Sequence, residues 1–107
     1  MSIKNEKLGN KIKNAADDAG TSIRNAANDV KTGVKNASNN AGNKANKAAN
    51  NAKAESGNIF DKAGAAIKNT VNDVKTSSKN AANSAENETE KAANKLDNKA
   101  KKAARDN

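Results

Sequence analysis

The stretch IRNAANDVKTGVKNASN, residues 23–39, decides the fold because it returns 44 residues later as IKNTVNDVKTSSKNAAN, residues 67–83. That spacing is four times eleven. After a lead-in of residues 1–7, residues 8–106 divide into nine rows of 11 residues without insertion or deletion. A fixed period of this kind indicates a repeat architecture and is interpreted before any other pattern.

Apolar residues occupy fixed places in each row. Places one and five hold most of the large apolar side chains, and places eight and nine are mostly Ala-Ala. Eleven residues make three turns of about 3.67 residues, so these places stay on one side of an α-helix. The stripe is roughly 100° wide, as in an amphipathic helix. Its predicted large members are Leu8, Ile12, Ile23, Val30, Val34, Ile59, Phe60, Ile67, Val71, Val74 and Leu96.

The composition does not supply a globular core. The 107 residues carry a formal charge of +8 and include 23 Ala but only 13 larger apolar residues. Complete burial of those 13 would yield about 20–40 kcal/mol, against roughly 100–200 kcal/mol of ordering entropy. The 21 Asn are typical of a disordered chain. We therefore predict an all-α chain when ordered, either a long amphipathic helix or a helical hairpin, that is largely disordered in dilute solution.

Two weak joints are expected, near residues 38–43 and 55–58, where Ser, Asn and Gly cluster. A hairpin that breaks in this region would pair early rows with late rows and bury both apolar segments. Each Gly costs a helix about 1 kcal/mol relative to Ala, and Asn is also a poor helix former. The 11-residue period favours a helix, whereas the low helix propensities of Gly and Asn oppose it. A conditional helix, which forms only when water is lost, requires this combination.

No residue pattern predicts catalysis, a metal site or a cofactor. The chain has no His or Cys, no Gly-rich phosphate loop and no metal-ligand spacing. The acidic cluster of Glu86, Glu88 and Glu90 is interpreted as solvated surface, because residues two apart point away from each other on a helix. We predict that the protein is not an enzyme.

A membrane surface is the partner that the stripe favours. Lysines border the stripe on both edges, where they can reach anionic headgroups while the apolar side chains dip in weakly and reversibly. One edge holds Lys31, Lys53 and Lys75, and the other holds Lys11, Lys44 and Lys99. The sequence contains no run of seven apolar residues, so it predicts neither a signal peptide nor a membrane span. A cytoplasmic location is expected, with an organelle as the alternative.

Two other classes of partner stay open. The 20 Lys and Arg against 12 Asp and Glu permit non-specific binding to nucleic-acid phosphates. One Arg in each half and a single aromatic residue argue against a dedicated nucleic-acid protein. Self-association is the third expectation, because an 11-residue repeat can form the seam of a right-handed coiled-coil oligomer, although this seam would consist mostly of Ala, Ser and Thr.

The rows resemble group 3 late embryogenesis abundant (LEA) proteins, whose motif is apolar-apolar-Glu/Gln-x-apolar-Lys-Glu/Gln-Lys-apolar-x-acid/amide. Residues 26–36, AANDVKTGVKN, fit its apolar frame, with Asn28 and Thr32 in place of Glu/Gln and Gly33 in place of Lys. Residues 70–80 fit less well, because Thr70 and Ser78 occupy apolar positions. Synuclein-like and perilipin-like lipid-surface helices are similar in their 11-residue repeats and Lys flanks. The chain departs from the plant-type pattern in being Asn-rich and net basic.

The resemblance implies a stress protectant of the hydrophilin type. Such a protein is disordered in water, becomes helical on drying, and shields client proteins and membranes during desiccation, cold or osmotic stress through weak, non-specific contacts. Two alternatives remain: a constitutive amphipathic helix that binds lipid surfaces, and a structural right-handed coiled-coil oligomer.

Overall fold

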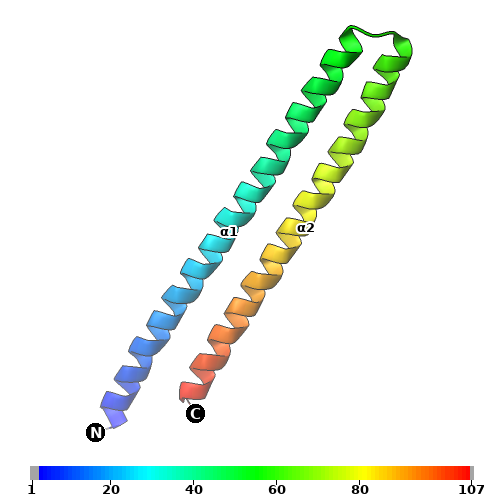
Figure 1. Cartoon of the computed structure of the whole chain (residues 1–107). Coiled ribbons are helices and arrows are strands. Elements are labelled where there is room, and N and C mark those ends of the chain that lie inside the picture. The colour runs from blue at the N-terminus through cyan, green and yellow to red at the C-terminus, as the bar shows by residue number, and fades with distance from the viewer. Residues whose placement is uncertain (1–2, 107) are drawn as a thin grey trace. The chain divides into compact units, whose positions relative to one another are not determined.

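The computed structural model describes residues 3–106. The chain forms two long helices, α1 (Ile3–Glu55) and α2 (Ile59–Asp106), and the described residues contain no strand (Figure 1). The prediction of an all-α chain is therefore confirmed. Residues 1–2 of the predicted lead-in lie outside the described residues.

Local sequence explains where the helices run and where they stop. The chain has no Pro, and α1 continues as helix through residues 38–43, because Gly and Asn weaken a helix without excluding it sterically. Acidic Glu6 and Asp61 lie in the first turns, and basic Lys53 and Arg105 lie in the last turns. These charges complement the helix dipoles. Within residues 3–106 the chain leaves the helix only at residues 56–58, within the second of the two stretches of Ser, Asn and Gly.

The turn is closed by its own hydrogen bonds. The Asn58 side-chain oxygen accepts from the backbone N–H groups of Phe60 (3.0 Å) and Asp61 (3.1 Å), and the Asp61 carboxylate accepts from the Asn58 N–H (3.1 Å). This reciprocal arrangement is a capping box. A Cβ on Gly57 would lie 2.6 Å from the Asp61 Cβ, so glycine is required there.

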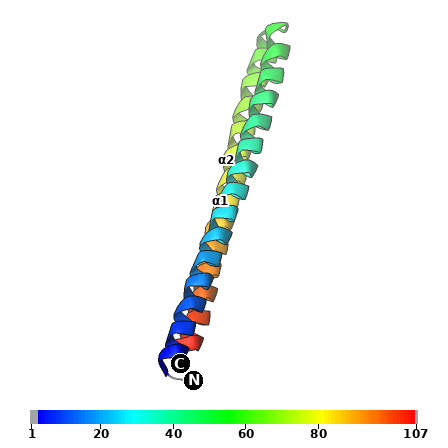
Figure 2. The same ribbon diagram turned by 90° about the vertical axis from the view of Figure 1, so that its left-hand side faces the viewer.

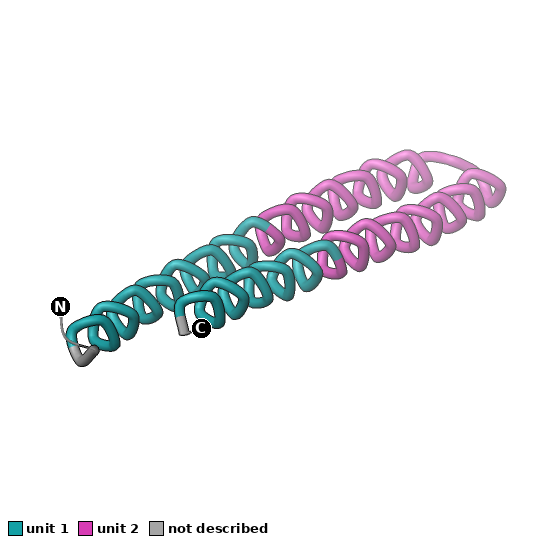
Figure 3. Tube along the Cα trace, turned by 90° about the horizontal axis from the view of Figure 1, so that it is seen from below, with its two compact units in different colours: residues 1–31, 86–107 teal, residues 32–85 magenta. Residues whose placement is uncertain are grey.

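The chain divides into two compact units (Figure 3). Unit 1 comprises Met1–Lys31 with Glu86–Asn107, and unit 2 comprises Thr32–Ala85. Within each unit, a segment of α1 lies beside a segment of α2 and runs in the opposite direction (Figures 1 and 2). Unit 2 contains the turn and is therefore a helical hairpin, one of the two predicted architectures.

The helices of each unit meet mainly through polar residues and, near the turn of unit 2, through two alanines. The buried side chains are Thr21, Asn25 and Asn87 in unit 1, and Ala54 and Ala65 in unit 2. The expectation that a hairpin would bury both apolar segments is wrong. The large residues of the apolar stripe are between 45% (Val71) and 81% (Phe60) exposed. The reason is that the Asn-rich face, which lies opposite the stripe, provides complementary donors and acceptors for the other helix.

Candidate interaction surfaces

Half-buried and buried side chains recur along each helix at steps of three and four residues. Glycines apart, α1 presents Asn10, Asn14, Asp17, Thr21, Asn25, Asn28, Thr32, Asn36, Asn39, Asn43, Lys47, Asn50 and Ala54, and α2 presents Ala65, Asn69, Asn72, Thr76, Asn80, Asn83, Asn87, Lys91, Asn94, Asn98, Lys102 and Arg105. We call these positions the polar seam. They follow the same 11-residue period as the apolar stripe and lie about 180° from it around each helix.

Amide side chains bond directly across the seam. In unit 2, Asn39 donates to Asn80 (3.1 Å), and Asn80 in turn donates to Asn40 (2.9 Å). Asn69 is bonded in the same way between Asn50 (3.0 Å) and Asn51 (2.9 Å). Further single bonds run from Asn83 to Asn36 in unit 2 and from Asn94 to Asn25 in unit 1. Asn suits this role because its amide is both donor and acceptor.

Three carboxylates are held by a repeated arrangement that we call the carboxylate clamp. An Asn and a Lys, four residues apart on one helix, both donate to one Asp of the other helix, at 2.8 Å and 3.0–3.1 Å. The three clamps are Asn98 and Lys102 on Asp18, Asn87 and Lys91 on Asp29, and Asn43 and Lys47 on Asp73. The first two are in unit 1 and the third in unit 2. Residues four apart share one helix face, which lets both donors converge.

The clamps shift the pKa values of their members. The amide of Asn98, and then the ammonium of Lys102, hold the pKa of Asp18 below its ordinary value. The pKa values of Asp29 and Asp73 are lowered in the same way, first by the amide and then by the ammonium of their clamps. The hydrogen bond to Asp29 raises the pKa of Lys91. The three carboxylates are 50–53% exposed, so each clamp orients the helices more than it stabilises them.

The seam is not completely satisfied. In each clamp the Asn side-chain oxygen, on Asn43, Asn87 and Asn98, is buried and has no hydrogen-bond partner among the described residues. The Thr21 hydroxyl is also buried and has no hydrogen-bond partner among the described residues. A partly satisfied polar network contributes less to stability than a complete one. The seam is therefore a weak contact that defines a geometry.

The apolar stripe faces away from the seam. In unit 1, Ile12, Ile23 and Leu96 are 63–69% exposed, and in unit 2, Val34, Ile67 and Val74 are 60–67% exposed. The six lysines predicted to border the stripe, Lys11, Lys31, Lys44, Lys53, Lys75 and Lys99, are all exposed. Each unit therefore presents apolar side chains, bordered by ammonium groups, on the outer side of both of its helical segments.

The 11-residue pattern predicts the apolar stripe, but it does not predict that the opposite, polar face forms the contact between the helices. The signal was present: places three, seven and ten of the nine rows hold Asn or Thr at 19 of 27 positions. They were interpreted as a solvated face because polar residues usually face water. The residues that bond across the seam are 18–95 residues apart in the sequence, so no local pattern shows which Asn meets which.

Comparisons with protein-family models, with curated proteins and with solved structures found no match. Among the described residues, neither helix is long and apolar enough to cross a membrane. Nor do those residues include a group of three or more carboxylates that could hold a metal ion. The polar seam and the apolar stripe are the two features of the described residues that indicate a function.

Proposed function

We propose that this chain is a cytoplasmic stress protectant of the type that group 3 LEA proteins represent. It folds into amphipathic helices when water is lost and shields proteins and membranes. One observation carries the proposal: polar side chains and, in unit 2, the small side chains of Ala54 and Ala65 lie between the helices, while the apolar stripe stays exposed. This is the reverse of a contact driven by the hydrophobic effect, and it makes folding depend on water activity.

Water competes with every bond of the seam. A side-chain hydrogen bond contributes about 0.5–1.5 kcal/mol net in water, because the unfolded chain bonds to water instead. Exposed ion pairs such as Lys47–Asp73 contribute about 0–1 kcal/mol. Burial of Ala54 and Ala65 adds little apolar area. The ordering entropy opposes all of these, at about 1–2 kcal/mol per residue. In dilute solution the balance therefore favours the open chain.

Water loss reverses this balance. When the competing solvent is withdrawn, backbone N–H and C=O groups bond to each other in helices, and the amides of the seam bond to their counterparts. Hydrogen bonds are also stronger where the local dielectric constant is low. The closed units then expose the apolar stripe, which covers membrane or exposed hydrophobic patches on client proteins. The lysines and amides beside the stripe hydrate and space the neighbouring macromolecules.

Far-UV circular dichroism in dilute buffer and in a dried film tests the conditional fold. We expect coil in buffer and strong helix in the film. An enzyme that loses activity on drying supplies the functional readout, since it should retain more activity when dried with this protein than with an equal mass of an unrelated protein. A chain that is cooperatively helical in dilute buffer would contradict the proposal.

A matched pair of variants tests the contribution of the seam. Asn80→Ala removes a residue that bonds to Asn39 and Asn40, whereas Asn46→Ala changes an exposed residue outside the seam. Both substitutions raise helix propensity equally. Both variants should therefore gain helix on partial dehydration, but only Asn80→Ala should separate the two helical segments of unit 2. Equal separation in both variants would contradict a pairing that depends on the seam.

The exposed stripe also favours a second function, a constitutive helix that binds lipid surfaces. Replacing Ile59, Phe60, Ile67 and Val71 with Ser distinguishes the two. The change should abolish vesicle binding in dilute buffer if lipid binding is the function, and should barely change the protection of a dried enzyme if stress protection is. A structural oligomer would instead show a melting curve that depends on protein concentration.

A further inference from the structure

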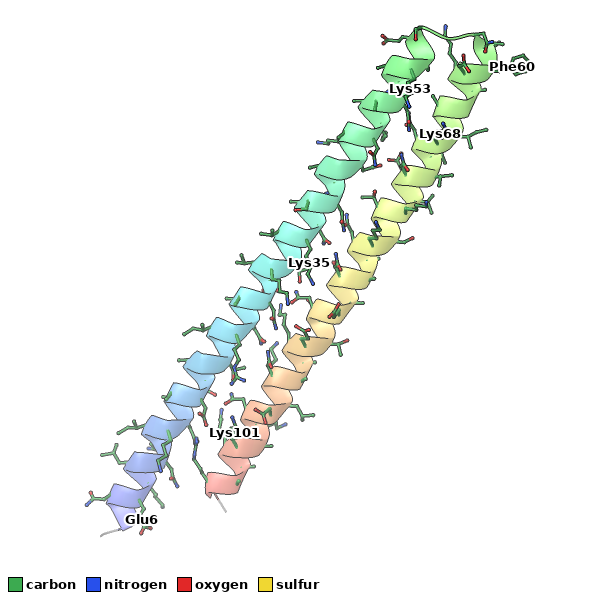
Figure 4. The ribbon with its side chains drawn as sticks, in the orientation of Figure 1. Glu6, Lys35, Lys53, Phe60, Lys68 and Lys101 are labelled. Carbon is green, nitrogen blue, oxygen red and sulfur yellow. The ribbon has the colours of Figure 1, made fainter. Side chains whose placement is uncertain are left out.

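Three shallow grooves lie between α1 and α2 along one side of unit 2. The first two share Ser38, Asn39 and Lys79, so they are continuous. The third begins one helical turn further along, at Asn50 and Lys68. We call this side the lysine face, after its lining residues Lys35, Lys53, Lys68, Lys75 and Lys79. Figure 4 shows Lys53 on α1 and Lys68 on α2 near the turn.

The positive charge of unit 2 is concentrated on this face. All five lysines are exposed, and none has an ion-pair partner among the described residues. Asp61 is the one carboxylate among the residues that line the three grooves, and it accepts a hydrogen bond from the turn. The groove on the other side of Ala54 and Ala65 is lined by Glu55 as well as Lys62.

Apolar groups lie among these lysines. Val34 and Ala82 line the groove that holds Lys35 and Lys79, and Phe60, which is 81% exposed, lines the groove that holds Lys53 and Lys68. Ammonium groups interleaved with apolar side chains suit a membrane interface, where headgroup phosphates lie directly above acyl chains. A strand of nucleic acid is bound through several stacked aromatic side chains or Arg, and this face offers Phe60 alone.

We propose that the lysine face of unit 2 docks on an anionic lipid bilayer. This inference rests on the proposed protective function and deepens it: in closed unit 2 the membrane is met by the lysine face together with the adjoining edge of the apolar stripe, at Val34 and Phe60. The face exists only when α1 and α2 lie side by side, because Lys35 and Lys79 come from different helices. On a single helix lying flat on its apolar stripe, these two lysines would point about 130° away from the stripe and stay in water.

The test is made in a glycerol–water buffer in which the chain is helical, and it measures binding to vesicles of mixed phosphatidylcholine and phosphatidylserine, with pure phosphatidylcholine vesicles as the neutral reference. The variant K35Q/K79Q removes one lysine of the face from each helix. The control K62Q/K95Q removes the same charge at two exposed lysines of α2 that lie outside the three grooves and are not among the six lysines that border the stripe. Each lysine held near an anionic surface contributes about a fivefold factor in affinity. We expect about a thirtyfold loss for K35Q/K79Q, and at most about threefold for the control because of screening.

Equal losses in the two variants, or a larger loss in the control, would overturn the assignment. A second variant, A54C/A65C, joins the two buried alanines and holds the hairpin closed when oxidised. It should bind the mixed vesicles at least as tightly oxidised as reduced, and a loss of binding on oxidation would also overturn the proposal. So would a thirtyfold effect of K35Q/K79Q on duplex DNA with none on vesicles. The dried-enzyme assay uses no lipid, so protection without vesicle binding refutes this inference alone.

Discussion

The glycines of α1 provide a direct test of the conditional helix. A Cβ placed on Gly9, Gly20, Gly33 or Gly42 would meet no neighbouring atom within 4 Å, so alanine fits at all four positions. Each Gly→Ala change should favour the helix by about 1 kcal/mol, and the four together by about 4 kcal/mol. A shift of that size multiplies the helix–coil equilibrium constant of α1 by about a thousand. We expect the quadruple variant to be strongly helical in dilute buffer, where the proposed function requires the natural chain to be largely coil.

Circular dichroism during a trifluoroethanol titration measures this effect. The quadruple variant should start with high helicity and need less alcohol, and it should also associate in buffer, because helices formed in water expose the apolar stripe. Gly57→Ala is the matched control. It is also a Gly→Ala change, but it lies in the turn and not in α1, and its new Cβ would lie 2.6 Å from the Asp61 Cβ and disturb the turn. If the quadruple variant and the natural chain have the same helicity and the same midpoint, propensity does not limit α1, and the reasoning is refuted.

Three further outcomes are expected. The pKa of Asp73 lies below its ordinary 3.8 because an amide and an ammonium group of α1 donate to the carboxylate, so ionised Asp73 stabilises unit 2 above that pH. The distance between spin labels at Ser38 and Ser78, measured in partly dehydrated samples, should increase as the pH falls below 3.8, and Asp73→Asn should remove this dependence. Asn58→Ala removes the cap of α2 and should cost about 1 kcal/mol, measured as a higher alcohol midpoint. Val34→Ser, at a residue 60% exposed, should leave the label distance unchanged.

The sequence predicted the helices and the stripe, because both follow from periodicity. Row length alone indicated that Leu8 and Val30 share a helix face. The stretch around Gly57 was identified as a weak joint, and the chain turns there. The face through which each helix contacts the other was not predicted, because the apolar residues were expected to lie between the helices. That expectation fails when the apolar side chains are few and the opposite face carries matched amides, as at Asn39 and Asn80.

The antiparallel register depends on charge more than on the amides. An Asn pairs with any Asn, so a slip of 11 residues would bring new amides into contact along much of the seam. The clamps do not tolerate such a slip. In one direction Asp18 would meet Asn87 and Lys91, but Asp29 would meet Thr76 and Asn80 and lose its lysine.

The turn fixes the same register independently. Asn25–Asn94, Asn36–Asn83 and Asn50–Asn69 are all centred between residues 59 and 60, directly after the turn at residues 56–58. Because the turn and the clamps favour the same register, the two helical segments pair in one specific way even though each bond is weak. In unit 2 this register keeps the apolar residues Val34, Ile67 and Val74 outward, which is the geometry that the proposed protective function requires of the closed hairpin.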